Sequence, residues 1–430
     1  MPLSPDVPET RNPAPGVDLL CIPTRRFKRP GIWVHFDHEG GEGNAARTLV
    51  AKVLQQGTSA LPSRRHLAAE LESLWGGGFR LGGRRVGDLH RTTLGLRWTA
   101  PSLLPPDAGD LTGPSMDLGR AVLEDPRRGQ GGEFFPGNVV EREKGELLRE
   151  IEVLPEDRSA WADEIFLARM CKGEPCATPP WGSEEDVQGL GAEALEEARQ
   201  GFLASAKITV IAVGPVDFSA LETRLASWLG DRDGGVDLAA PTVPPAPGSL
   251  REIRQDADVD QARFRMGFRA PRGLAGGPRE AQALASAILG GGSQGRLFRI
   301  IREERSLAYG IYASLQPYKG LLVVEAGIDG SSYEEVRDEV LRQVENLASS
   351  GPNEEELTRA RTRILQRWEG LEDTAPGLGA YWGGESLLGT MSSTAERAET
   401  LNSVEADAVA EAATTWLPDL AFILGPEEGK

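Results

Sequence analysis

The sequence predicts an α+β fold of two homologous, α/β-sandwich-like domains, each a mostly antiparallel sheet packed against helices. Residues 230–249 are rich in glycine, proline and aspartate and lack apolar periodicity, which is typical of an interdomain linker. On either side of this stretch the chain shows the same order of extended and helical segments, with three consecutive glycines at residues 76–78 and 290–292. An internal duplication explains this repeat. We therefore expect one domain at residues 1–229 and a second at 250–430.

The first half contains segments of both helical and strand character. Residues 44–55 place their apolar side chains on one helical face, whereas residues 207–213 form a continuous apolar run with β-branched residues that suits a central strand. The expected helices are residues 44–55, 63–74 and 217–229, and the expected strands are residues 31–36, 90–98 and 207–213.

The second half repeats this order and ends in long helices. Asn353 is expected to cap one of these helices, because Glu356 follows three residues later as in a capping box. The expected strands are residues 261–270, 309–315 and 321–327, and the expected helices are residues 278–289, 294–304 and 332–348, with a further helix after Asn353. We assign the apolar stripes of these helices to core packing.

The composition excludes several classes of protein. The 65 acidic and 47 basic side chains give a formal charge of -18, and the resulting field repels nucleic-acid backbones. Apolar residues make up 40% of the chain, yet no apolar run approaches the roughly 20 residues that span a bilayer. Residues 1–16 lack the basic and apolar segments of a secretory signal. We therefore expect a cytoplasmic protein without nucleic-acid or membrane partners.

The three cysteines, Cys21, Cys171 and Cys176, are an odd set. Cys171 and Cys176 have the spacing of half a metal site, but no second pair lies near them in the sequence. We therefore expect buried free thiols at these positions.

Residues 290–327 carry the most specific pattern in the chain. After the glycine run come Arg296, Leu297 and Phe298, then Arg302, and finally Leu307, Ala308 and Tyr309 at the start of a strand. This segment resembles the C-terminal half of the pitrilysin/insulinase family of inverted zinc metallopeptidases (peptidase family M16), particularly its two-domain bacterial and mitochondrial-processing-type members. The duplication and the linker fit the same family, so the resemblance covers nearly the whole chain.

The resemblance implies a zinc position in the first half. Active members carry H-x-x-E-H on a helix, where two histidines bind zinc and the glutamate activates water. Aligned on Gly57, Thr48 and Lys52 take the places of the histidines, and Ala51 that of the glutamate. A hydroxyl and an ammonium cannot replace two imidazoles, and Ala51 offers no base. Glu150 matches the third ligand but is expected to be a helix-face carboxylate, so we expect no metal in this chain.

His35 and His38, in the sequence HFDHE, superficially imitate a metal motif and leave open the hypothesis of an independent metalloenzyme. Residues 32–36 are expected to be a strand, however, and side chains three residues apart on a strand point to opposite faces. A turn after Phe36 would be needed to bring the two imidazoles together. The plainer interpretation is two polar residues at the end of a strand.

Arg302 and Tyr309 match a second feature of the family. In active members an arginine and a tyrosine seven residues apart, contributed by the C-terminal half, reach the zinc site and hold the substrate backbone and the oxyanion. A guanidinium stays charged and offers several donors, and a phenol adds a neutral donor where charge develops. The alternative is structural: Arg302 as an ion-pair partner of the adjacent Glu303 and Glu304, and Tyr309 as an aromatic residue at a strand start.

Together these features resemble the non-zinc subunit of the family's two-chain members. We expect a metal-free subunit that pairs with a zinc-bearing homologue, encloses a peptide substrate with it, and supplies Arg302 and Tyr309 to the partner's site. Such a chain should not hydrolyse peptides alone. The alternative is a catalytically inactive peptidase-fold protein that acts as a peptide-binding or assembly scaffold. A homodimer also stays open, since a duplicated fold can pair with itself.

Overall fold

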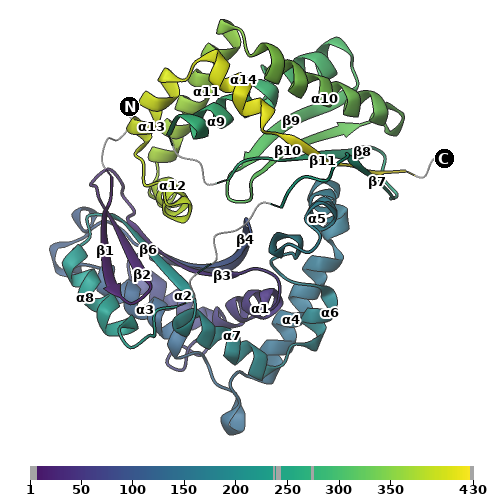
Figure 1. Cartoon of the computed structure of the whole chain (residues 1–430). Coiled ribbons are helices and arrows are strands. Elements are labelled where there is room, and N and C mark those ends of the chain that lie inside the picture. Colours follow the sequence, from purple (N-terminus) through teal and green to yellow (C-terminus); the bar gives the residue numbers. More distant parts are fainter. Residues whose placement is uncertain (1–6, 236–237, 239–243, 273–275, 427–430) are drawn as a thin grey trace.

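The computed structural model describes residues 7–235, 238, 244–272 and 276–426. Within them the chain forms two sheets with their helices, one sheet in each half of the chain (Figure 1). The expected linker at residues 230–249 falls partly outside the described residues. None of the helices that the structure describes combines the length and the apolar character needed to cross a membrane.

The first sheet has six strands in the order β1-β2-β6-β3-β5-β4. Strands β2 and β6 are parallel, and the other neighbouring pairs are antiparallel. The strands are β1 (Glu9–Ala14), β2 (Val17–Pro23), β3 (Gly31–Glu39), β4 (Gly78–Val86), β5 (Leu89–Arg97) and β6 (Lys207–Gly214). The helices of this half are α1 (Asn44–Leu54), α2 (Arg64–Ser73), α3 (Thr112–Glu124), α4 (Gly137–Glu152), α5 (Arg158–Met170), α6 (Glu184–Gly189), α7 (Ala192–Ala204) and α8 (Phe218–Leu229).

The second sheet has five strands in the order β7-β11-β8-β10-β9, with only β7 and β11 parallel. The strands are β7 (Arg251–Asp256), β8 (Ala262–Arg269), β9 (Ala308–Gln316), β10 (Leu321–Ile328) and β11 (Leu417–Gly425). The helices are α9 (Gly276–Gly290), the π-helix η6 (Phe298–Glu304), α10 (Tyr333–Ser350), α11 (Glu354–Glu372), α12 (Ala375–Leu388), α13 (Thr394–Ser403) and α14 (Ala406–Thr414). Short 3₁₀ turns occur at Pro101–Leu103, Pro106–Ala108, Gln130–Gly132, Leu154–Glu156, Pro175–Ala177 and Gly330–Ser332. The prediction of two mostly antiparallel sheets packed against helices is confirmed.

Several elements follow directly from local sequence signals. The apolar face expected for residues 44–55 is the buried face of α1, which packs into the core of the first half. Asn353 caps α11 by accepting a hydrogen bond from the backbone N–H of Glu356, whose carboxylate accepts from the Asn353 N–H. These pairings satisfy backbone groups that the first helical turn leaves without partners.

Other elements differ from the sequence prediction. Strand β4 was not expected, because its sequence GFRLGGRRV is rich in glycine and arginine; it forms as an edge strand by pairing with β5. The helix expected at residues 294–304 begins only at Arg296 and is π-helical over Phe298–Glu304. Helix α3 was also missed.

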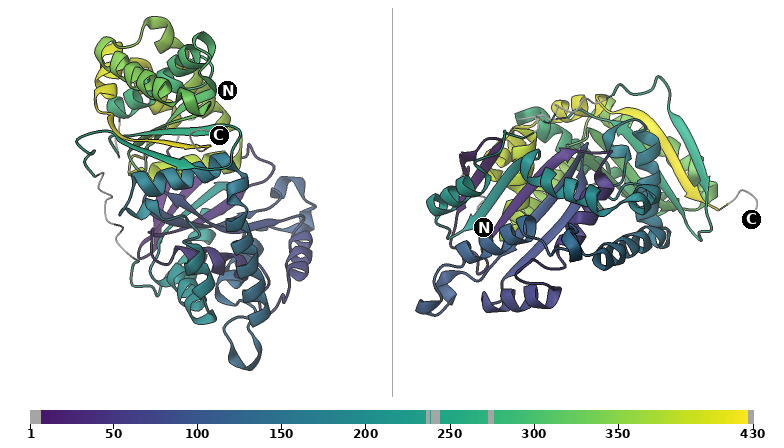
Figure 2. Two further views of the ribbon diagram at one scale, coloured as in Figure 1. Left: turned by 90° about the vertical axis from the view of Figure 1, so that its right-hand side faces the viewer. Right: turned by 90° about the horizontal axis from the view of Figure 1, so that it is seen from below.

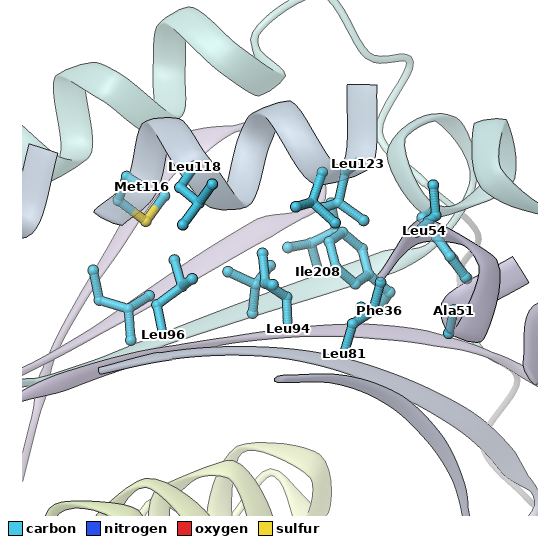
Figure 3. Packing of buried hydrophobic residues seen from close by; sticks show 14 of the residues in the cluster. Phe36, Ala51, Leu54, Leu81, Leu94, Leu96, Met116, Leu118, Leu123 and Ile208 are labelled. Atoms are coloured by element: carbon cyan, nitrogen blue, oxygen red, sulfur yellow. The ribbon is translucent and has the colours of Figure 1, made fainter. Parts of the chain in front are cut away.

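Each half has its own hydrophobic core between its sheet and its helices. In the first half, Met116, Leu118 and Leu123 of α3 pack over Leu94 and Leu96 of β5, as Figure 3 shows. In the second half, α9, α10 and α14 cover the corresponding face of the second sheet. Each core is large enough to fix its sheet, so the strand ends that carry candidate site residues are held in place.

The two halves exchange one helix each. Helix α5 of the first half packs on the face of the second sheet that is turned away from the second half's own core, where Phe166 and Met170 meet Phe422 of β11. Helix α12 of the second half packs on the corresponding face of the first sheet, where Trp382 meets Ile211 of β6. The two exchanged helices occupy equivalent places in the duplication and lie in the layer between the sheets (Figures 1 and 2). Each half therefore completes the burial of the other's sheet.

The tips of two hairpins meet between the halves. At the β4–β5 turn, a Cβ on Gly87 would lie 2.5 Å from the carbonyl oxygen of Tyr318, in the β9–β10 turn. Beside this contact, the Lys319 ammonium lies 2.6 Å from Asp88 and 2.5 Å from Glu174, and all three side chains are largely buried. The contact joins the edge strands β4 and β9 at their ends, one from each sheet.

Candidate functional site

The position of the family's zinc motif holds an ion pair in this chain. Lys52, on α1, places its Nζ 2.7 Å from Oε1 of Glu150, on α4. Ala51 is only 1% exposed and belongs to the hydrophobic core. The ammonium thus occupies the carboxylate that would serve as the third ligand, and the neighbouring positions offer neither an imidazole nor a base. These residues do not fit a zinc ion.

Thr48, at the place of the first histidine ligand, is engaged within the fold. Its Oγ1 lies 2.5 Å from the carbonyl oxygen of Pro180, to which it donates, and 3.1 Å from Nε2 of His90. Because the Thr48 hydroxyl donates its hydrogen bond to the Pro180 carbonyl, its oxygen accepts a hydrogen bond from the Nε2–H of His90. Burial, with the charge of Arg47 nearby, lowers the pKa of His90 to about 3, so this imidazole is neutral at neutral pH.

His35 and His38 lie on opposite faces of β3. The His35 ring faces α12 and places its Nδ1 2.8 Å from Oγ1 of Thr93. The His38 ring faces α7, where its Nε2 lies 3.3 Å from the carbonyl oxygen of Gly201. The two imidazoles therefore do not share a site. The register of β3 and β5 instead makes His38 a cross-strand neighbour of His90, a pairing that the sequence did not indicate.

Arg302 is positioned by the end of the π-helix η6. After the helix, Ser306 adopts a left-handed conformation with φ 54°, and the Leu307 N–H donates to the carbonyl oxygen of Ile301 at 2.8 Å. This turn directs the chain into β9. Arg302 Nε then donates to the carbonyl oxygen of Tyr309 at 2.9 Å, and the guanidinium stacks 4.8 Å from the Phe298 ring centre.

Arg302 and Tyr309 are brought together at the surface. Tyr309 is 66% exposed at the start of the edge strand β9, and Arg302 is also exposed. Within the described part of the chain, Arg302 forms no ion pair, whereas Glu304 lies 3.8 Å from Arg299. The ion pair with Glu303 or Glu304 that the structural alternative requires is therefore not present in these residues. The terminal N–H groups of the guanidinium and the phenol both face outward.

The cysteines are free and buried, and two of them are neighbours. The sulfur atoms of Cys171 and Cys176 and a carboxylate oxygen of Glu174 lie within 4.8 Å of one another. A hydrogen bond from Cys176 lowers the pKa of the Cys171 thiol. Glu174 is already paired with Lys319 and with Arg269, the latter at 2.8 Å, so two cations compete with any metal ion here. We assign this cluster to the interface between the halves.

The comparisons with known proteins show which family the chain resembles. A family model described as "Peptidase M16 inactive domain" matches residues 189–364. Over these residues the chain resembles the M16 peptidase family. It is 25% identical over 337 residues to the "Probable inactive metalloprotease YmfF" of Bacillus subtilis, covering 78% of each chain. It is 26% identical to the "Uncharacterized zinc protease SCO5738" of Streptomyces coelicolor, covering 70% of this chain and 67% of that one.

Solved structures show the same fold. A conserved protein from Enterococcus faecalis V583 matches with a TM-score of 0.89 at 21% identity, covering 99% of this chain and 100% of the other. A peptidase M16 inactive domain from Pseudomonas fluorescens matches with a TM-score of 0.78 at 19% identity, covering 97% and 98%. Together with the family model and the relatives above, this confirms the resemblance inferred from residues 290–327.

Proposed function

We propose that this chain is the zinc-free subunit of a heterodimeric metallopeptidase and supplies Arg302 and Tyr309 to the zinc site of a homologous partner. One observation carries the proposal. Arg302, near the end of η6, and Tyr309, at the start of the edge strand β9, are exposed side by side, while the Lys52–Glu150 ion pair fills the metal position of the same chain. The chain thus retains the donors that act on a substrate and has lost the groups that hold zinc.

The geometry suits stabilisation of negative charge. The bond from Arg302 Nε to the Tyr309 carbonyl fixes the guanidinium plane and leaves its terminal N–H groups for a substrate carbonyl or an oxyanion. The Tyr309 phenol offers a second, neutral donor from the adjacent strand. Neither residue is a nucleophile or a base here, so the proposal assigns them the positioning of the scissile carbonyl. Zinc and the attacking water belong to the partner.

The proposal includes peptide as the substrate class and the cytoplasm as the location. Because the chain lacks the zinc ligands, the proposal predicts that the purified chain alone does not cleave peptides. A homodimer of this chain would lack a zinc motif on both sides and is expected to be inactive as well.

The test is reconstitution. The chain is mixed with a zinc-bearing homologue from the same source, complex formation is verified by size-exclusion chromatography, and hydrolysis of a fluorogenic peptide is measured. Arg302→Ala and Tyr309→Phe should each lower kcat by about 10²-fold, the scale of losing one oxyanion donor. Arg299→Ala is the matched control, because Arg299 lies on the same π-helix and pairs only with Glu304 among the described residues.

Unchanged turnover in both variants, with the complex intact, would reject the catalytic role. It would leave the scaffold function, in which the same surface serves assembly alone. Stoichiometric zinc in the purified chain would contradict the proposal, because the proposal requires a subunit without zinc.

A further inference from the structure

A cavity of about 620 Å³ opens in the second half of the molecule, and its lining includes neither Arg302 nor Tyr309. Its walls come from the last turns of α9 with the glycine turn after it, the end of β9, the middle of α11, and α12. The cavity is therefore a feature of the second half that the proposed function does not use.

The internal duplication makes this cavity the counterpart of the lost zinc position. Helix α9 is equivalent to α1, β9 to β4 and α11 to α4, because each has the same place in the order of elements. In the first half, Lys52 and Glu150 bridge α1 and α4. In the second half, α9 presents Ala283, Ser286 and Ala287, whose small side chains leave the space beside α11 open.

Two cations on α11 line the cavity. Arg363 and Arg367 lie one helical turn apart, and both side chains are exposed. Among the residues that the structure describes, neither guanidinium has an ion-pair or hydrogen-bond partner. Like charges at this spacing repel each other, so an anion between them would relieve that repulsion as well as form charge-assisted hydrogen bonds. In a chain of formal charge -18, this is a local site for a negative group.

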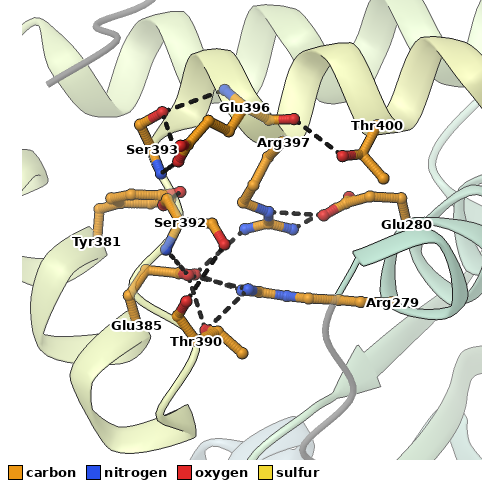
Figure 4. Close-up of polar contacts among 10 residues, drawn as sticks. All are labelled: Arg279, Glu280, Tyr381, Glu385, Thr390, Ser392, Ser393, Glu396, Arg397 and Thr400. Carbon is orange, nitrogen blue, oxygen red and sulfur yellow. Dashed lines mark hydrogen bonds and ion pairs between the residues drawn. The ribbon is translucent and has the colours of Figure 1, made fainter. Parts of the chain in front are cut away.

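The other arginines of the lining are already neutralised. Arg279 lies 2.5 Å from Glu385, and Arg397 lies 2.7 Å from Glu280, as Figure 4 shows. These pairs are largely buried and fix α9, α12 and α13 to one another, which closes one end of the cavity with a rigid wall. In this wall each arginine is neutralised by a glutamate of the same wall. The unpaired positive charge is therefore confined to the α11 side.

The glycine turn after α9 lets the Arg363 guanidinium lie close to the backbone. Gly292 has φ 103°, and a Cβ there would lie 2.5 Å from Nη1 of Arg363. Gly290 allows the end of α9 to approach the backbone of Ala313 in β9. Strand β9 has β10 as its one strand neighbour in the sheet, so its other edge is open to an added strand over part of its length.

We propose that this cavity binds the carboxylate of an extended peptide, with Arg363 and Arg367 as its partners. Apolar peptide side chains then contact the aliphatic part of the lining, which includes Ile364, Leu371 and Leu388. The carboxylate comes either from the peptide's C-terminus or from an acidic side chain, and the chemistry of recognition is the same. The site belongs to this chain alone and does not depend on a zinc-bearing partner.

The experiment measures fluorescence anisotropy of labelled peptides with the purified full chain. The first probe is a fluorescein-labelled heptapeptide of alanine, valine and leucine with a free C-terminal carboxylate. The second is its C-terminal amide, and the third is the amide with one internal glutamate. We expect the free acid, the glutamate peptide or both to bind at least about tenfold more tightly than the amide, since charge-assisted hydrogen bonds carry the affinity.

Arg363→Gln and Arg367→Gln should each weaken binding of the preferred probe by about tenfold. Arg359→Gln is the matched control, because Arg359 lies on the same helix and pairs with Glu355 outside the cavity. Circular dichroism verifies that the variants fold. Equal affinity for the acid, glutamate and amide peptides, unchanged binding in both cavity variants, or no binding of any probe would overturn the proposal. None of these outcomes affects the reconstitution test, in which the partner is present.

Discussion

Lys319 gives the sharpest test of how the halves are held together. It projects from the β9–β10 turn, is 3% exposed, and lies within 2.6 Å of Asp88 and 2.5 Å of Glu174, both from the first half. Replacement by methionine keeps much of the side-chain volume but removes the cation. Two carboxylates then remain at a largely buried interface without their shared partner.

The expected loss of stability depends on the cations that remain beside the two carboxylates. Arg272 remains 3.4 Å from Asp88, and Arg269 remains 2.8 Å from Glu174, so part of the negative charge is still compensated. Breaking a buried pair by removing one partner costs about 3–5 kcal/mol. With this compensation we expect Lys319→Met to lower the free energy of unfolding by about 3 kcal/mol, the lower end of that range.

Urea denaturation followed by tryptophan fluorescence measures this change, and the nine tryptophans of the chain provide the signal. Lys172→Met is the matched control, because Lys172 is exposed and has no ion pair in the described part of the chain. The control should change stability by less than about 0.5 kcal/mol. A loss below about 1 kcal/mol for Lys319→Met would refute the reasoning, because loss of an exposed surface ion pair already lowers stability by up to about that amount.

Two further predictions concern the cores of the halves. Burial, together with the charge of Arg47, lowers the pKa of His38 from 6.5 to about 4, so its contribution to stability is full above pH 6.5 and is lost as the pH falls towards 4. The total loss is on the order of 3 kcal/mol. The free energy of unfolding, measured by urea denaturation at several pH values in this interval, should therefore depend less steeply on pH in His38→Gln than in the unmodified chain. An unchanged pH dependence would contradict the assignment. Gly290→Ala should cost about 1–3 kcal/mol in the same assay, because its Cβ would overlap the backbone of β9. Gly370→Ala, with open space around it in α11, should instead be neutral or stabilising, and equal effects of the two would exclude the packing explanation.

Elements with strong local signals could be predicted from the sequence. Helix α1 and the capped start of α11 depend on residues within a few positions of one another, so periodicity and spacing suffice. The pairing of Arg302 with Tyr309 is also local, since only the end of the π-helix η6 and one turn separate them. The family resemblance rested on this same segment.

Features that depend on distant partners could not be predicted in this way. Strand β4 forms against its intrinsic preference because β5 supplies its hydrogen bonds, and His38 meets His90 only through the register of β3 and β5. The cavity arginines Arg363 and Arg367 have a visible spacing on α11, but 40 of the 47 basic residues are arginine, so that spacing carried little information. Their meaning depends on the small residues that α9 places opposite them.

The exchange of α5 and α12 makes the two halves mutually dependent for folding. A fragment ending at residue 229 would leave uncovered the part of its own sheet that receives Trp382, and α5 would expose the Phe166 surface that it now hides against β11. Proteolytic nicking between the halves should therefore yield two pieces that copurify. An assembly that includes this chain must therefore bind it as one folded unit. Neither half could separate from the other to join another subunit without exposing apolar surface to water.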